Sequence, residues 1–202
     1  MKFKTLTVGL YEVNCTLAID GADAWVVDPG ADEEAIVKAA EAEGAKIAGV
    51  LLTHAHFDHI GAIPGIKARF PEAPVYVHPS DEVMFGHPFN RLPPEYPSFP
   101  KPAGVVDARK FPLAEVIETP GHTPGGVCYL FKTGDGKPDT LFSGDTLFCC
   151  SVGRTDFPGG DMATLQESLE KLKVLPKDTV VVPGHGIETT IARELASNPF
   201  LQ

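Results

Sequence analysis

Six consecutive positions hold four side chains of the kinds that bind divalent metal ions. The segment reads His-Ala-His-Phe-Asp-His and runs from His54 to His59. In an extended chain, residues two apart face the same way, so His54 and His56 can converge on one point while Asp58 and His59 turn toward another. Imidazoles and carboxylates are the expected ligands of zinc and related ions. The segment therefore predicts two half-sites for metal ions in one loop.

Three further candidate ligands each follow a short apolar run that is typical of a strand. His122 follows AEVIETPG, Asp145 follows DTLFSG and His185 follows TVVVPG. Proline and glycine end a strand and permit a tight turn, and loops at strand ends gather functional groups. A solvated surface loop is the alternative interpretation of the first cluster, and these later ligands at strand ends argue against it.

Seven candidates are too many for one tetrahedral ion and suit two. They divide into two sets of three and one bridging residue: His54, His56 and His122; Asp58, His59 and His185; and Asp145 as the bridge. Two dications, two carboxylates and one bridging hydroxide leave a net charge of about +1, which would stabilise an oxyanion. This favours a catalytic site over a closed structural one.

Other polar residues near these motifs carry weaker signals. Asp28 in VVDPG is either a partner that fixes a ligand histidine or an ordinary turn-capping aspartate. His78 and His87 are interpreted as ordinary surface or core histidines.

The elements that must position these residues alternate between sheet and helix. Runs rich in β-branched residues predict strands at 13–20, 24–28, 47–53, 75–78, 114–119, 127–132, 139–145 and 179–183. Turn residues at 20–23 and 133–136 predict hairpins, which indicate antiparallel meanders. Helical patterns cover 31–44, 60–70, 161–173 and 188–197. The chain is therefore expected to be a mixed α/β protein with two sheets covered by helices.

Composition limits the classes of partner. A chain of 202 residues with 43% hydrophobic residues can bury a full core as one domain or two fused half-domains. A net charge of −10 without basic runs argues against nucleic acid and anionic membranes. No segment approaches the roughly 18 apolar residues of a transmembrane helix. Nothing in the sequence indicates an oligomeric state.

The four cysteines lack Cys-x-x-Cys spacing, so they are interpreted as reduced thiols of a cytoplasmic protein. The adjacent pair Cys149 and Cys150 is interpreted as small buried apolar side chains without a role. The proline-rich stretch 86–104 has little periodicity and is expected to form a flap beside the site.

The motifs together resemble the metallo-β-lactamase superfamily, and its glyoxalase II (hydroxyacylglutathione hydrolase) branch in particular. The pattern T-H-x-H-x-D-H matches Thr53 to His59, and TPGHTPGG, SGDTLF and VPGHG match the later ligand motifs in order. The resemblance implies a four-layer αββα sandwich of two mixed sheets, formed by a single domain over residues 1–202. Full-length glyoxalase II enzymes carry a C-terminal helical domain, whereas this sequence ends at Gln202 without one, so a short form is expected.

The resemblance also implies a reaction, which is hydrolysis of a small thiolester such as S-lactoylglutathione by a metal-bridged hydroxide. Two divalent ions are expected, zinc first, with iron or manganese as alternatives. Asp145 would bridge the ions and Asp58 would take the proton of the attacking water. Arg154 is the candidate for binding a substrate carboxylate, and its alternative role is an ion pair with Asp156 or Asp161.

Two other functions remain open at this point. A persulfide dioxygenase would hold one iron ion through two histidines and a carboxylate, which His54, His122 and Asp145 can supply. A non-catalytic module would use metals only for stability and bind a protein partner through the stretch 86–104.

Overall fold

The protein is described by a computed structural model that covers residues 1–90, 99–134 and 136–202. Its chain forms two compact units, Met1–Ala108 and Arg109–Gln202. Each unit has its own sheet and its own hydrophobic core. The single domain expected over residues 1–202 stays a prediction.

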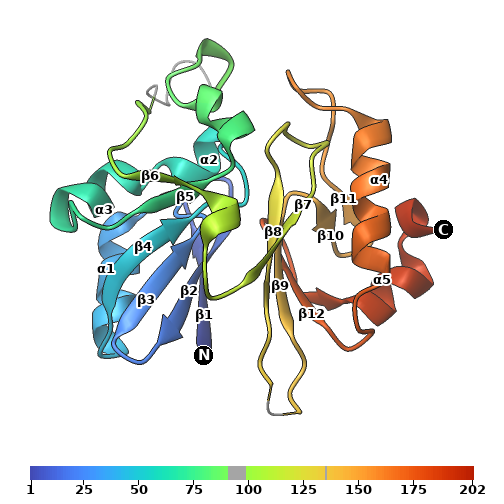
Figure 1. Ribbon diagram of the computed structural model, residues 1–202, viewed down its shortest axis with the longest axis horizontal. Helices are drawn as coiled ribbons and strands as arrows, with labels where there is room; N and C mark the ends of the chain where they lie inside the picture. The colour runs from blue at the N-terminus through green and yellow to red at the C-terminus, as the bar shows by residue number, and fades with distance from the viewer. Residues whose placement is uncertain (91–98, 135) are drawn as a thin grey trace. The chain divides into compact units, whose positions relative to one another are not determined.

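The first unit contains a six-stranded sheet whose strands follow one another in chain order (Figure 1). These strands are β1 Lys2–Val8, β2 Val13–Asp20, β3 Asp23–Val27, β4 Lys46–Leu51, β5 Val75–Val77 and β6 Val105–Asp107. Strands β1 to β3 are antiparallel neighbours, and the predicted turn at 20–23 joins β2 to β3. Strands β3 to β6 are parallel neighbours.

Helices account for this parallel arrangement. Helix α1, Glu33–Ala42, connects β3 to β4, and the short helices α2, Phe57–Ile60, and α3, Ile63–Arg69, connect β4 to β5. A helical crossover returns the chain to the starting end of the sheet, so the next strand runs parallel to the last. The antiparallel part of the sheet thus ends at β3, and the sheet as a whole is mixed, as the resemblance implies. Side chains of α1 and α3, such as Ile36 and Ile66, share a core with Leu17 and Val50 of the sheet.

The second unit contains a five-stranded sheet in the order β13-β12-β9-β8-β7, and a separate two-stranded hairpin, β10-β11. The strands are β7 Glu115–Glu118, β8 Val127–Phe131, β9 Thr140–Gly144, β10 Leu147–Phe148, β11 Ser151–Val152, β12 Val180–Pro183 and β13 Thr189–Thr190. Only β9 and β12 pair in parallel among these strands. Strands β8 and β9 are antiparallel partners, as the turn residues at 133–136 predict.

Helices α4, Met162–Lys173, and α5, Ile191–Ser197, pack against this second sheet (Figure 1). Asp161 caps α4, because its side chain accepts a hydrogen bond from the Thr164 amide at 2.7 Å. Leu165 and Leu169 lie one turn apart and join Leu141 and Val181 in the core. This apolar face holds the helix on the sheet that carries the later ligand motifs.

All eight predicted strands and four predicted helices have counterparts whose ends shift by up to three residues. No predicted strand corresponds to β1, β6, β10, β11 or β13. The last four are two or three residues long, too short for an alternating pattern to register. In the part of the chain that the structure describes, every helix is too short or too polar to cross a bilayer.

Candidate metal centre

The loop after β4 gathers three histidines of the first unit. His54 and His56 stand between the strand and α2, which carries Asp58 and His59. The ring centroid of His54 lies 4.8 Å from that of His56 and 4.1 Å from that of His59. All three imidazoles are buried, and Asp58 is partly exposed. The structure therefore brings together the candidate ligands of this loop.

A buried carboxylate supports the loop from the neighbouring strand end. Asp28, which follows β3, accepts hydrogen bonds from the Thr53 amide at 2.8 Å and from the Thr53 hydroxyl at 2.6 Å. The Thr53 oxygen also lies 3.1 Å from His54 Nδ1. Because the hydroxyl proton points to Asp28, the oxygen must accept from Nδ1–H, and His54 Nε2 then carries the lone pair that a metal requires.

Asp28 also approaches a second candidate ligand. Its Oδ2 atom lies 3.1 Å from His59 Nδ1. The backbone of Asp28 has a φ of 48°, in the left-handed region that non-glycine residues rarely occupy. Of the two interpretations of Asp28, these contacts match the partner of ligand histidines.

Two further polar residues hold the backbone of this loop, and sequence reasoning missed both. The Ala55 amide donates to Asp81 Oδ2 at 3.1 Å, and the Phe57 amide donates to Asn90 Oδ1 at 2.8 Å. Asn90 Nδ2 donates in return to the Ala55 carbonyl at 2.7 Å. Asp81 and Asn90 are buried in the short 3₁₀ helices Pro79–Met84 and Pro88–Asn90. No local motif marks them, because their partners lie 26 and 33 residues away.

Asn90 belongs to the proline-rich stretch 86–104, of which residues 91–98 lie outside the described residues. The expected flap therefore stays a prediction. His78, just before the first 3₁₀ helix, accepts a hydrogen bond from the Ser80 amide at 3.2 Å and caps that helix.

The second unit brings its three candidate ligands together around one carboxylate oxygen. Asp145 follows β9 and His185 follows β12, and parallel neighbours end at the same edge of a sheet. Asp145 Oδ2 lies 3.6 Å from His122 Nε2 and 3.7 Å from His185 Nε2. Two ligands of one tetrahedral zinc ion, with bonds of about 2.1 Å, stand roughly 3.4 Å apart. The spacing suits a carboxylate between two metal-binding imidazoles.

The backbone around His122 fixes the proton on its ring. His122 Nδ1 lies 2.7 Å from the carbonyl oxygen of Arg154, so Nδ1–H donates there and Nε2 faces Asp145 with its lone pair. Gly153 allows the backbone to pass close to Asp145, since a Cβ at Gly153 would lie 1.7 Å from the Asp145 carbonyl oxygen. In the first unit Gly30 has the same role beside Asp58, because a Cβ at Gly30 would lie 1.8 Å from the Asp58 carbonyl oxygen.

The donor sets fit divalent metal ions in each unit taken by itself. In the first unit, atoms of His54, His59 and their partner Asp28 lie within 4.8 Å of one another. In the second, two imidazole nitrogens flank one carboxylate oxygen. Neutral nitrogen and charged oxygen donors suit zinc, iron and manganese alike.

The side chain of Arg154 forms a bidentate ion pair. Its Nε and Nη2 atoms donate to the two oxygens of Asp156, both at 2.6 Å, and its guanidinium lies 3.9 Å from the centre of the Phe157 ring. Hydrogen bonding from Arg154 lowers the pKa of Asp156 to about 2. Arg154 therefore forms the ion pair with Asp156 that was its alternative role in the sequence analysis, and its role in substrate binding stays a prediction.

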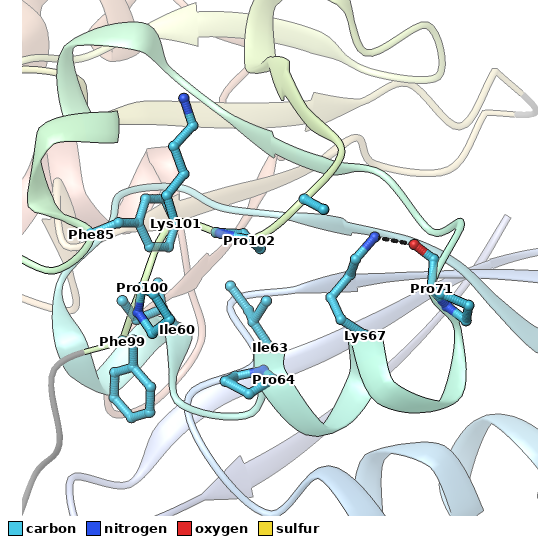
Figure 2. Close-up of a pocket in the computed structure, with 11 residues that line it drawn as sticks. Ile60, Ile63, Pro64, Lys67, Pro71, Phe85, Phe99, Pro100, Lys101 and Pro102 are labelled. Carbon is cyan, nitrogen blue, oxygen red and sulfur yellow. Dashed lines mark hydrogen bonds between the residues drawn. The ribbon is translucent and has the colours of Figure 1, made fainter.

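An apolar cavity of about 280 Å³ lies beside α2 and α3 in the first unit (Figure 2). Ile60, Ile63, Phe85 and Phe99 line it, together with several prolines. The ammonium group of Lys67 is bound to the carbonyls of Pro71 and Ala73. The cavity therefore offers shape and apolar surface rather than reactive groups.

Comparison with known families supports the same chemistry. The family model described as "Metallo-beta-lactamase superfamily" matches residues 8–185, a range that includes all seven candidate ligands. The chain belongs to the metallo-β-lactamase superfamily. A superfamily relative from Haemophilus influenzae, named "Hydroxyacylglutathione hydrolase GloC", is 33% identical over 100% of this chain and 98% of its own length.

Solved structures of the superfamily confirm the predicted fold class. "BLEG-1 B3 metallo-beta-lactamase" is 36% identical with a TM-score of 0.87 and covers 99% of both chains. "TTHA1623 in a di-iron-bound form" is 35% identical with a TM-score of 0.84 and covers 98% of this chain and 100% of its own. "ETHE1 from Myxococcus xanthus" is 29% identical with a TM-score of 0.75 and covers 98% and 84%. The superfamily fold with two mixed sheets is therefore established.

Proposed function

We propose that this superfamily member is a metal-dependent thiolester hydrolase that acts on substrates of the S-lactoylglutathione type. The observation that carries the proposal is the position of Asp145 Oδ2 between the Nε2 atoms of His122 and His185. A carboxylate that faces two imidazole nitrogens at this spacing suits a bridge between two ions. The relative named hydroxyacylglutathione hydrolase, which matches this chain over its whole length, supports the choice of substrate.

The ligand allocation of the proposal is the one that the sequence predicts. His54, His56 and His122 would hold one ion, Asp58, His59 and His185 would hold the other, and Asp145 would be shared by both. Zinc is the proposed metal, with iron or manganese as alternatives, and the di-iron form of one similar structure shows that such a fold holds iron. A bound metal pair would supply a hydroxide near neutral pH and an electrophile for the carbonyl oxygen of the substrate.

The side chains of the protein have separate tasks in this reaction. Asp145 orients the attacking water, and Asp58 accepts its proton. The thiolate leaves without a strong general acid, because a thiol has a pKa of about 8.5. Arg154 is proposed to bind a substrate carboxylate, for which its guanidinium would exchange Asp156 for the substrate.

We further propose that the protein works in the cytoplasm. None of the four cysteines, all of which are among the described residues, forms a disulfide. Reduced thiols are typical of proteins that work in a reducing compartment.

A second candidate function is persulfide dioxygenation with one iron ion. The similarity to the structure titled ETHE1 from Myxococcus xanthus favours it. His54, His122 and Asp145 would then be the iron ligands. One iron per chain and oxygen consumption on glutathione persulfide would distinguish it from the hydrolase.

The deciding experiment is a panel of thiolesters, S-lactoylglutathione first, assayed on protein of measured metal content, with a β-lactam and glutathione persulfide as further substrates. We expect thiolester hydrolysis by protein with about two ions per chain. Asp145→Ala should lower turnover more than about 100-fold, because loss of a direct ligand costs more than loss of an outer-sphere partner. The variant should also contain less metal.

The matched control is Asp178→Ala, which removes an exposed carboxylate of the same unit. This variant should keep both activity and metal. In the same panel, Arg154→Ala should raise KM for anionic thiolesters only. Near-normal turnover of Asp145→Ala would refute the metal assignment, and a preference for the β-lactam or the persulfide would refute the substrate.

A further inference from the structure

The adjacent cysteines Cys149 and Cys150 form the tip of a hairpin. Strand β10 ends at Phe148 and β11 begins at Ser151, and these two residues face each other in the hairpin. The cysteines are therefore the two central residues of a tight turn. Cys149 is half-buried and Cys150 is exposed. The expectation that both are buried apolar side chains is wrong for Cys150, because a turn at a hairpin tip has little core to pack against.

Cys150 has a backbone conformation that normally selects another residue. Its φ is 58°, in the left-handed region where glycine or asparagine usually occupies the turn. A cysteine in this region is strained, and strained non-glycine residues cluster at functional sites. The surrounding structure holds it there, since the Cys150 amide donates to the buried Glu194 carboxylate at 2.8 Å.

The two sulfur atoms have a spacing that suits chelation. The Sγ atoms of Cys149 and Cys150 lie 4.0 Å apart. Two thiolates bound to one tetrahedral zinc ion, with bonds of about 2.3 Å, stand roughly 3.8 Å apart. A disulfide requires about 2.05 Å, so the observed arrangement is much closer to a chelate than to a disulfide.

A negative charge completes the cluster. Cys149, Cys150 and Glu194 each offer a ligand atom within 4.8 Å of the others. Glu194 is fixed by the Thr189 hydroxyl at 2.5 Å and by Asn198 Nδ2 at 2.8 Å. Soft thiolates with one carboxylate favour a d¹⁰ cation over hard ions such as magnesium.

We propose that Cys149 and Cys150 chelate one soft divalent cation of the zinc group, with the Glu194 carboxylate beside it. Each binding event forms two metal–sulfur bonds and releases the two thiol protons to solvent. Because both thiols must lose a proton before they bind the cation, binding should tighten as pH rises. The site is distinct from the His and Asp centre and does not depend on the proposed function.

Cadmium is the probe that separates this site from the histidine centre. Cadmium–thiolate bonds absorb in the ultraviolet through charge transfer, whereas histidine and carboxylate ligands do not produce this band. We expect reduced protein to develop the band on addition of Cd²⁺, and two thiols per chain to lose their reactivity toward a thiol reagent in the folded state.

The key variant is Cys150→Gly, because glycine adopts the observed φ without strain and removes one sulfur. This variant should fold with an unchanged or higher Tm. It should bind cadmium through sulfur more than 100-fold more weakly, because loss of a direct ligand costs more than the roughly 10–100-fold that loss of an outer-sphere partner costs. Cys149→Ser should weaken binding similarly. Cys128→Ser, which changes a buried thiol of the same unit, should leave the band unaltered.

Two outcomes would overturn the proposal. One is a charge-transfer band of equal strength and affinity in Cys150→Gly and in the wild-type protein. The other is a band that disappears in Cys128→Ser while both turn cysteines are intact.

Discussion

Single hydrogen bonds decide which nitrogen of two candidate ligand histidines can face a metal. The Thr53 hydroxyl oxygen accepts a hydrogen bond from Nδ1–H of His54, and the carbonyl oxygen of Arg154 accepts one from Nδ1–H of His122. In both residues Nε2 then carries the lone pair. Such outer contacts fix ring orientation and raise the basicity of the ligand. The geometry of the site thus depends on residues that bind no metal themselves.

At this scale we predict that Thr53→Val lowers metal affinity about 10–100-fold. Valine has a similar shape but cannot link Asp28 to His54, so the imidazole loses its fixed orientation. Competition with a chromophoric chelator measures the change. Thr53→Ser keeps the hydroxyl and serves as the control; equal affinities of the serine and valine variants would show that the link has no role.

The ends of strands position the candidate ligands. Strands β9 and β12 are parallel neighbours, and the Gly184 amide donates to the Gly144 carbonyl at 2.8 Å, directly beside His185 and Asp145. In the loop between β4 and α2, buried side chains also bind the backbone. Asp81 and Asn90 do so at Ala55 and Phe57. These two buried side chains therefore do for the first loop what strand pairing does for the later ones.

Asn90→Ala should destabilise the protein and loosen this loop. The Phe57 amide and the Ala55 carbonyl lose a buried partner, which costs about 1–3 kcal/mol for each group. Urea unfolding measures the free energy, and metal analysis should show reduced retention of metal. Ser80→Ala, an exposed change in the neighbouring 3₁₀ helix, is the control. An Asn90→Ala variant as stable as this control would contradict the assigned support.

The described residues of the two units form two hydrophobic cores, and none of the seven candidate ligands belongs to either core. The fold therefore draws its main stabilisation from apolar burial rather than from metal. This distinguishes a catalytic centre from a structural one, in which loss of metal unfolds the protein.

We accordingly predict that the metal-free protein stays folded and has a lower Tm. Bound ions at 100 times their dissociation constant stabilise by about 2.7 kcal/mol, which corresponds to roughly 5–10 °C for a chain of this size. Circular dichroism after chelation and dialysis measures both properties, and added zinc should restore the Tm. Complete unfolding on metal removal would favour the non-catalytic module instead.

The sequence alone determined which residues are candidate ligands, their order and their location at strand ends, because apolar runs and turn residues are local patterns. His122, Asp145 and His185 could be selected as candidates in this way, and the superfamily could be named from their motifs. Only the tertiary structure decided which groups support them. Thr53 and Asp28 are 25 residues apart, His122 and Arg154 are 32 apart, and Phe57 and Asn90 are 33 apart. Such pairs meet only when the complete backbone path is fixed, and no local pattern specifies that path.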